Sequence, residues 1–173
     1  MNRNILITLS FAILMCTVCS CNKDDNEEVD PVSSENKAKA AALEEYLKVN
    51  AFSLTKYSSD SPIDYIDTDQ VVKAETDLWK YVSSWIKDDK YIFNNGEVTI
   101  EQNAVKIPGD SSATLNRSYS VEATKDGVIF NFVGHEYQPL KYNLINFSDT
   151  ALLLSAEWNG KTVKSEYRSN PNP

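Results

Sequence analysis

From residue 90 onward, apolar and polar side chains alternate in short runs that are separated by tight-turn sequences. The runs 90–93 and 97–100 flank Asn94-Asn95-Gly96. Asn-Gly tolerates the positive φ angles of a two-residue turn, so these runs predict a β-hairpin. Further runs of the same kind lie at 117–123, 128–133, 141–147, 151–158 and 162–168. Sequential strands joined by short turns predict an antiparallel meander.

Such a meander buries one face of every strand by closing into an up-and-down barrel or by wrapping around a helix. We therefore expect a mainly β fold over 36–168, with about eight strands preceded by one or two helices. Ser34 is the expected cap of the first helix, and Asp67 with Gln70 forms an expected capping box for the second. The expected elements before residue 90 are a helix over 35–49, a strand over 51–57, a polar loop over 58–68 and a helix over 69–87.

Composition excludes several function classes. The formal net charge is −8, with 17 basic and 25 acidic residues. This argues against a nucleic-acid partner, which needs a basic face. All three cysteines, Cys16, Cys19 and Cys21, lie at the N-terminus. The body of the chain therefore has no disulfide framework, cysteine-ligated zinc site or thiol nucleophile.

Residues 1–20 have the pattern of a lipoprotein signal peptide. A short positive segment at Asn2-Arg3-Asn4 precedes an apolar run over 5–18, which is too short to span a bilayer as a helix. The run ends in Val18-Cys19-Ser20-Cys21, which resembles a bacterial lipobox. This resemblance implies that diacylglyceryl and acyl groups such as palmitate on Cys21 anchor the protein in a lipid bilayer. The alternative is an ordinary secretory signal or an uncleaved anchor.

The segment after Cys21 is polar and acidic. Lys23, Asp24 and Asp25 resemble the surface-export signal of Bacteroidetes lipoproteins. The resemblance implies an outer-membrane lipoprotein that faces outward from a Gram-negative cell, whereas a plain solvated linker would have a similar composition. We expect 21–35 to combine the lipidated cysteine with a flexible tether, and 169–173 to be a disordered tail.

The body of the chain also resembles a known family. The segment 85–100 contains an acidic pair, an aromatic strand, the Asn95-Gly96 turn and a second strand, and it looks like the lipocalin-like domains of Bacteroidetes lipoproteins. Phe52-Ser53-Leu54 lies where that family has its first strand, and the likeness covers about 50–168. The chain departs from the family pattern in lacking a cysteine before the acidic pair and in having an extra helix at 36–49. The resemblance implies a small lipocalin-like β-barrel with no agreed ligand.

No residue pattern predicts a catalytic or metal site. His135 is the one histidine, and no Gly-x-Ser-x-Gly motif accompanies it. No glycine-rich nucleotide-binding motif is present. Four carboxylates could offer oxygen ligands to Ca²⁺, but the Asp-x-Asp-x-Asp-Gly loop is absent, so a solvated loop is the simpler interpretation. These carboxylates are Asp60, Asp64, Asp67 and Asp69. We expect no catalytic residue, metal or cofactor.

The aromatic side chains are the remaining signal. In strands where apolar and polar residues alternate, the aromatic side chains lie on the apolar face. That face either lines a ligand cavity or fills the core. Trp85 is expected to point to the barrel centre from the second helix, with Trp79 about 120° away around the helix axis. We favour a filled barrel. The candidate ligand or core residues are Trp79, Trp85, Tyr119, Phe130, Phe132 and Trp158.

Taken together, these patterns predict a non-enzymatic lipoprotein that acts as an interaction or accessory subunit. Its expected partners are the bilayer and an outer-membrane protein complex, which it would contact through the loops 58–67 and 134–139. The first alternative is a carrier that takes an apolar small molecule or a glycan into the barrel. The second alternative is an enzyme of unidentified chemistry.

Overall fold

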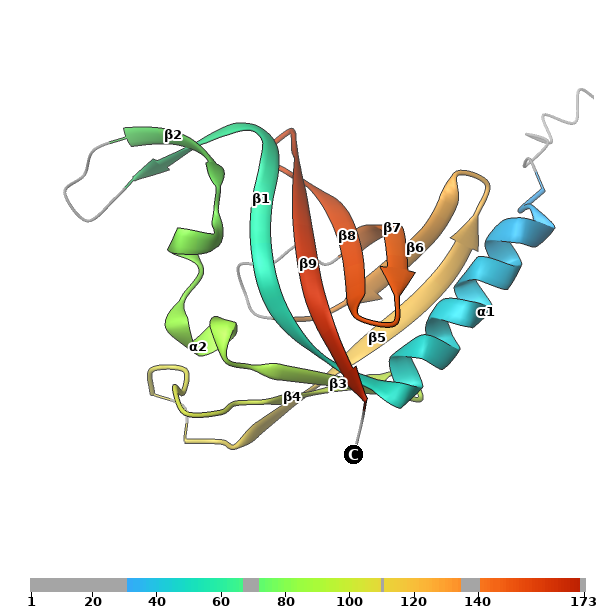
Figure 1. Ribbon diagram of the computed structural model, residues 1–173, viewed down its shortest axis with the longest axis horizontal. Helices are drawn as coiled ribbons and strands as arrows, with labels where there is room; N and C mark the ends of the chain where they lie inside the picture. The colour runs from blue at the N-terminus through green and yellow to red at the C-terminus, as the bar shows by residue number, and fades with distance from the viewer. Residues whose placement is uncertain (1–30, 67–71, 110, 135–140, 172–173) are drawn as a thin grey trace, which may run out of the picture.

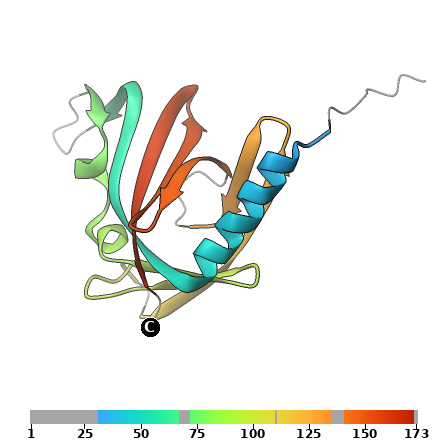
Figure 2. The ribbon, with the colours of Figure 1, turned by 45° about the vertical axis from the view of Figure 1, so that its right-hand side comes forward.

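The computed structural model describes residues 31–66, 72–109, 111–134 and 141–171. The protein is mainly β: eight antiparallel strands close into an up-and-down barrel through the β1–β9 ladder, and β2 adds one strand beside β1 (Figures 1 and 2). This confirms the expected lipocalin-like class, with an N-terminal helix before the barrel. The elements are α1 (Ser34–Val49), β1 (Asn50–Ile66), β2 (Val72–Asp77), the 3₁₀ turn η1 (Trp79–Tyr81), α2 (Ser84–Lys87), β3 (Lys90–Asn94), β4 (Glu97–Glu101), β5 (Thr114–Thr124), β6 (Gly127–Phe132), β7 (Lys141–Ser148), β8 (Ala151–Trp158) and β9 (Lys161–Pro171).

The first helix forms where the sequence predicts it, but its cap lies one residue earlier. The Ser33 hydroxyl accepts a hydrogen bond from the Asn36 N–H at 3.1 Å, so Ser33 and not Ser34 is the N-cap. Leu43 and Leu47, one helical turn apart, are fully buried. The helix packs against β5, β3, β6 and β1 and closes one end of the barrel.

The predicted hairpin at 90–100 is confirmed. Asn95 and Gly96 both have positive φ, 48° and 83°, as a type I′ turn requires. Phe93 pairs with Val98 across the hairpin, and both side chains face the core. The five later strands lie where the alternation predicts them, with ends that differ by up to three residues.

The region between 58 and 87 corrects two expectations. The predicted loop at 58–68 is instead the continuation of β1 to Ile66, and the predicted helix at 69–87 is replaced by β2, η1 and the short helix α2. The apolar and polar residues of Val72–Asp77 fit the alternation of a strand as well as the spacing of a helix. Pairing with β1 satisfies the backbone N–H and C=O groups of this segment. The expected capping box at Asp67 and Gln70 lies outside the described residues.

The C-terminal boundary is also later than expected. Strand β9 continues to Pro171, which pairs with Asn50 at the start of β1. Residues 169–171 therefore belong to the barrel wall and not to a disordered tail. The ladder partner on β1 supplies order that the polar sequence Ser169-Asn170-Pro171 does not indicate by itself.

The barrel has two distinguishable ends. The helix end carries α1 and the β3–β4, β5–β6 and β7–β8 turns, and it lies to the right in Figure 1. The loop end carries the β4–β5 connection, the β8–β9 turn, the segment between β2 and β3, and the ribbon in which β2 pairs with Ile63–Ile66 of β1.

Candidate functional site

Four tyrosines from distant strands converge inside the half of the barrel nearer the loop end. They are Tyr57 on β1, Tyr91 on β3, Tyr142 on β7 and Tyr167 on β9, and we call them the tyrosine layer. The rings of Tyr91 and Tyr167 meet edge to face at 5.7 Å between centroids. Tyr142 stacks on Phe132 at 5.2 Å, and Tyr57 interacts electrostatically with both Tyr142 and Tyr167. The layer places phenol oxygens inside a mainly apolar core.

Burial determines the protonation of this layer. Tyr91, Tyr142 and Tyr167 are each at most 2% exposed. Loss of solvation raises the pKa of Tyr142 and of Tyr167 well above the usual value near 10, and the neighbouring phenols raise the pKa of Tyr142 further. Both phenols therefore stay neutral at physiological pH. The layer offers hydroxyl donors and acceptors and not a charged group.

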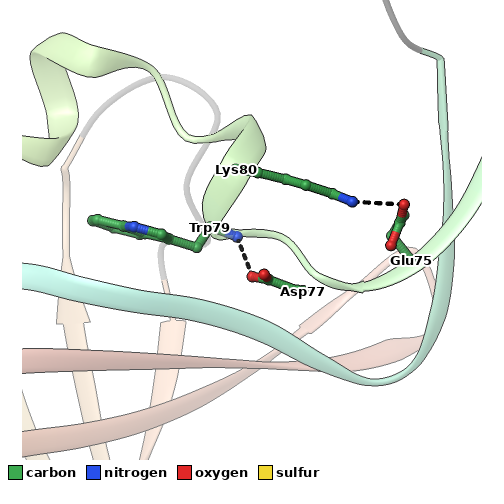
Figure 3. Close-up of polar contacts among 4 residues, drawn as sticks. All are labelled: Glu75, Asp77, Trp79 and Lys80. Atoms are coloured by element: carbon green, nitrogen blue, oxygen red, sulfur yellow. Dashed lines mark hydrogen bonds and ion pairs between the residues drawn. The ribbon is translucent and has the colours of Figure 1, made fainter.

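The segment Leu78–Lys87, which we call the strap, runs along the barrel wall beside this layer. Figure 3 shows how its 3₁₀ turn is pinned: the Trp79 N–H donates to Asp77 Oδ1 at 3.1 Å, and Lys80 Nζ meets Glu75 Oε1 at 2.6 Å. The Trp79 ring and the Lys80 side chain leave the turn in opposite directions. Lys87 Nζ lies 4.9 Å from the centre of the Trp79 ring, a cation–π contact.

The acidic pair after the strap organises the neighbouring loop. Asp88 Oδ2 accepts a hydrogen bond from the Val105 N–H at 3.0 Å, and the Asp88 carbonyl accepts one from the Asn103 amide. Asp89 is fully buried. Gln102, at the end of β4, holds the same loop from the other side through the Ile107 N–H at 2.9 Å. The β4–β5 connection at the loop end is thus held by defined contacts.

The six predicted ligand or core residues occupy three kinds of position. Phe130 and Phe132 are fully buried and stack at 5.1 Å, as the alternation predicts. Tyr119 is half-buried and meets Phe93 edge to face at 5.2 Å, and Trp158 is half-buried at the end of β8. Trp79 and Trp85 pack against the core from the strap. The expectation that Trp85 points to the centre from a long helix is wrong, because that helix is absent.

The other predicted sites are not assembled in the described residues. Asp60 pairs with Lys164 at 2.6 Å instead of joining a carboxylate cluster, and Asp67 and Asp69 lie outside the described residues. Among the described residues, no group of three or more His, Cys, Asp or Glu side chains could hold a metal ion. His135, Cys21 and the segment Lys23-Asp24-Asp25 also lie outside the described residues.

The tyrosine layer was not predicted, although part of its signal was present. Tyr91, Tyr142 and Tyr167 occupy inward positions of their alternating strands, next to the inward residues Phe93, Leu144 and Ser165. Alternation identifies the face of each strand but not which residues of distant strands meet. Their convergence follows from the barrel register.

Comparisons with known proteins identify no relative of this chain. No family model, curated protein or solved structure matches the chain. Within the part of the chain that the structure describes, no helix combines the length and the apolar character needed to cross a bilayer.

Proposed function

We propose that the protein is a non-enzymatic, lipid-anchored outer-membrane protein that serves at the cell surface as an interaction subunit. The observation that supports this is the filling of the barrel by aromatic rings. Phe93 contacts Phe52, Phe130 and Phe132 at 5.3 to 5.7 Å between centroids, and α1 closes the adjoining end with Leu43 and Leu47. Rings in mutual contact leave the outer surface as the place where a partner binds.

The position of α1 supports one orientation of this surface. The helix begins beside the β5–β6 turn, where the Asn36 amide donates to the Thr124 carbonyl at 2.8 Å. A tether from Cys21 would therefore reach the barrel at its helix end. The loop end would then point away from the membrane, toward a partner.

The anchor can be tested by metabolic labelling. Radiolabelled fatty acid should enter the wild-type protein and be absent from Cys21→Ala, whereas label retained in that variant would assign the lipid to Cys16 or Cys19. Protease added to intact cells should remove the domain, and alanines at Lys23, Asp24 and Asp25 should protect it. A wild-type domain that is cleaved only after lysis would place the protein in the periplasm.

The partner surface can be tested with two exposed valines at opposite ends of the barrel. Val105 lies at the loop end and is 40% exposed, and Val49 lies at the helix end and is 61% exposed. A photo-cross-linking residue at position 105 should form an adduct with a membrane-associated partner in intact cells, and one at position 49 should not. Adducts from position 49 alone would reverse the proposed orientation.

The alternative, a carrier for an apolar small molecule or a glycan, is favoured by the hydroxyls of the tyrosine layer. Because Trp79 and Trp85 lie at the wall beside this layer, an interior ligand should shift tryptophan emission and raise the melting temperature. Saturable binding of an apolar fluorescent probe, together with the emission shift and the rise in melting temperature, would show that the protein is a carrier and not an interaction subunit. Unchanged emission and melting temperature would support the filled barrel.

A further inference from the structure

The barrel wall has a gap between β1 and β3. These strands pair at two positions only, Ala51 with Ile92 and Phe52 with Tyr91. On the same side of β1, pairing with β2 begins at Ser58. Between Phe52 and Ser58, no strand of the described chain pairs with this side of β1. The strap runs along this interval, beside β1 in both views (Figures 1 and 2).

Unlike the strands beside it, the strap takes part in no β-ladder among the described residues. The Leu78 N–H donates to the Tyr57 carbonyl at 3.0 Å and joins the strap to β1. The backbone bonds that follow stay inside the strap: Tyr81 to Leu78, Val82 to Trp79, and Ile86 and Lys87 to Ser83. These internal bonds would survive if the strap moved as one piece.

Side-chain burial in the strap is also limited. Leu78 and Ile86 are its buried residues, whereas Trp79, Val82 and Trp85 are half-buried against the core. Low burial and few ladder bonds are the features of segments that open locally, at a lower free energy than global unfolding. The strap has both features, whereas the adjacent parts of β1 and β3 combine buried side chains with ladder bonds.

Both ends of the strap adjoin the tyrosine layer. Its first residue bonds to the backbone of Tyr57, and its last residues lead through Asp88 and Asp89 to Tyr91 at the start of β3. Tyr91 is fully buried while the strap is closed. Movement of the strap would uncover the interval of the wall that Tyr57 and Tyr91 flank.

We propose that the strap is a gate in the barrel wall, which opens while the barrel remains folded and thereby gives solvent access to the tyrosine layer. The two half-buried tryptophans hold the gate closed by packing on the core. The gate does not depend on the proposed function, since it concerns the wall and not the membrane anchor or the outer surface.

Hydrogen exchange of the full-length wild-type protein tests the first half of the proposal. The Leu78 amide, whose hydrogen bond to the Tyr57 carbonyl breaks when the strap leaves β1, should exchange through an opening whose free energy does not change with low concentrations of urea. Strand β8 is paired with β7 on one side and β9 on the other, so its amides should exchange only when the whole protein unfolds. A Leu78 amide that exchanges at the same urea-dependent free energy as the amides of β8 would overturn the gate.

Nitration of Tyr91, located by mass spectrometry, tests the second half. Trp79→Ala should loosen the gate and raise the nitration rate of Tyr91 by about tenfold. The matched control is Trp158→Ala, which also removes a half-buried tryptophan from the core but lies outside the strap. Its nitration rate should stay near that of the wild type. Equal rate increases in both variants, or none in Trp79→Ala, would overturn the proposal.

Discussion

The two halves of the barrel follow the same strand pattern but contain different cores. At the helix end the inward residues are mainly phenylalanines, among them Phe52, Phe93 and Phe130, and the buried leucines of α1 cover them. Toward the loop end the inward rings are Tyr91, Tyr142 and Tyr167. One half is closed by a helix of four turns, and the wall of the other includes a strap with two buried residues.

Tyrosine differs from phenylalanine by one hydroxyl, and burying that hydroxyl changes the energetics of the core. Phenylalanine rings gain stability from buried area alone, so an apolar helix face is a sufficient cover. A buried phenol oxygen also loses its hydration, so each buried tyrosine carries a polar cost that a phenylalanine does not. We expect stability to be concentrated in the helix half and local opening in the loop half.

The largest expected effect is the loss of a ring from the helix half. Phe130 is fully buried and contacts Phe93, Tyr119 and Phe132. Phe130→Ala should lower the free energy of unfolding by about 3–5 kcal/mol in urea titrations, because it leaves a cavity among packed rings. A loss smaller than that of Trp85→Ala would contradict the assignment of stability to this half.

The next effect concerns the turn at the helix end. Gly96 has a φ of +83°, and an added Cβ would lie 3.8 Å from the Tyr119 carbonyl oxygen, so space is not limiting. Gly96→Val should still lower the free energy of unfolding by about 1–3 kcal/mol through backbone strain alone. Ser118→Val, on strand β5 opposite Glu97, is the control that adds a branched side chain at a position without positive φ. Equal melting temperatures for Gly96→Val and the wild type would show that the turn lies elsewhere.

A smaller loss is expected in the strap. Trp85 is half-buried on the four-residue helix α2. Trp85→Ala should therefore lower the free energy of unfolding by about 1–2 kcal/mol, roughly half the value for a fully buried ring. A loss as large as that of Phe130→Ala would mean that the strap belongs to the main core, and the contrast between the halves would fail.

The smallest effect at neutral pH comes from the tyrosine layer. Tyr142 and Tyr167 have raised pKa values in the folded protein, whereas the unfolded value is near 10. Below pH 10 both states hold the protons, so stability is unaffected. Above pH 10 the unfolded chain releases protons that the folded chain retains, and stability falls by about 1.4 kcal/mol per pH unit for each tyrosine.

Tyr167→Phe isolates this contribution. The variant should differ from the wild type by about 1 kcal/mol or less at pH 7, where one buried hydroxyl is lost. Between pH 10 and 11 its stability should fall less steeply than that of the wild type, as measured by urea titration at each pH. Identical slopes would show that Tyr167 does not bind its proton more tightly in the folded state.

Much of the fold was predictable because its signals are local. The Asn95-Gly96 turn, the run of strands from 114 to 171 and the inward faces of Phe130 and Phe132 follow from turn chemistry and alternation. The helix predicted over 69–87 failed for an instructive reason. Val71, Leu78, Val82 and Trp85 have helical spacing, but Val72–Asp77 also alternates, and a partner strand decides between two patterns of similar strength.

The candidate site was less predictable than the fold. Alternation could assign single residues such as Phe130 to an inward face, but the sequence predicted Trp85 at the barrel centre, and the structure places it half-buried on the strap. The layer itself joins Tyr57 to Tyr167 across 110 positions of sequence, and no local pattern carries that information. The same holds for Asp60, whose partner Lys164 comes from the opposite end of the chain.

The sequence by itself determined which segments extend, where they turn and which side of each strand is apolar, because these properties depend on neighbouring residues and backbone sterics. The tertiary structure decided that β9 closes on β1, that the chain after β2 becomes a strap beside a gap in the wall, and that four tyrosines share one interior layer. Those outcomes depend on ladder register between distant strands. A shift of one residue in that register would turn every inward side chain outward.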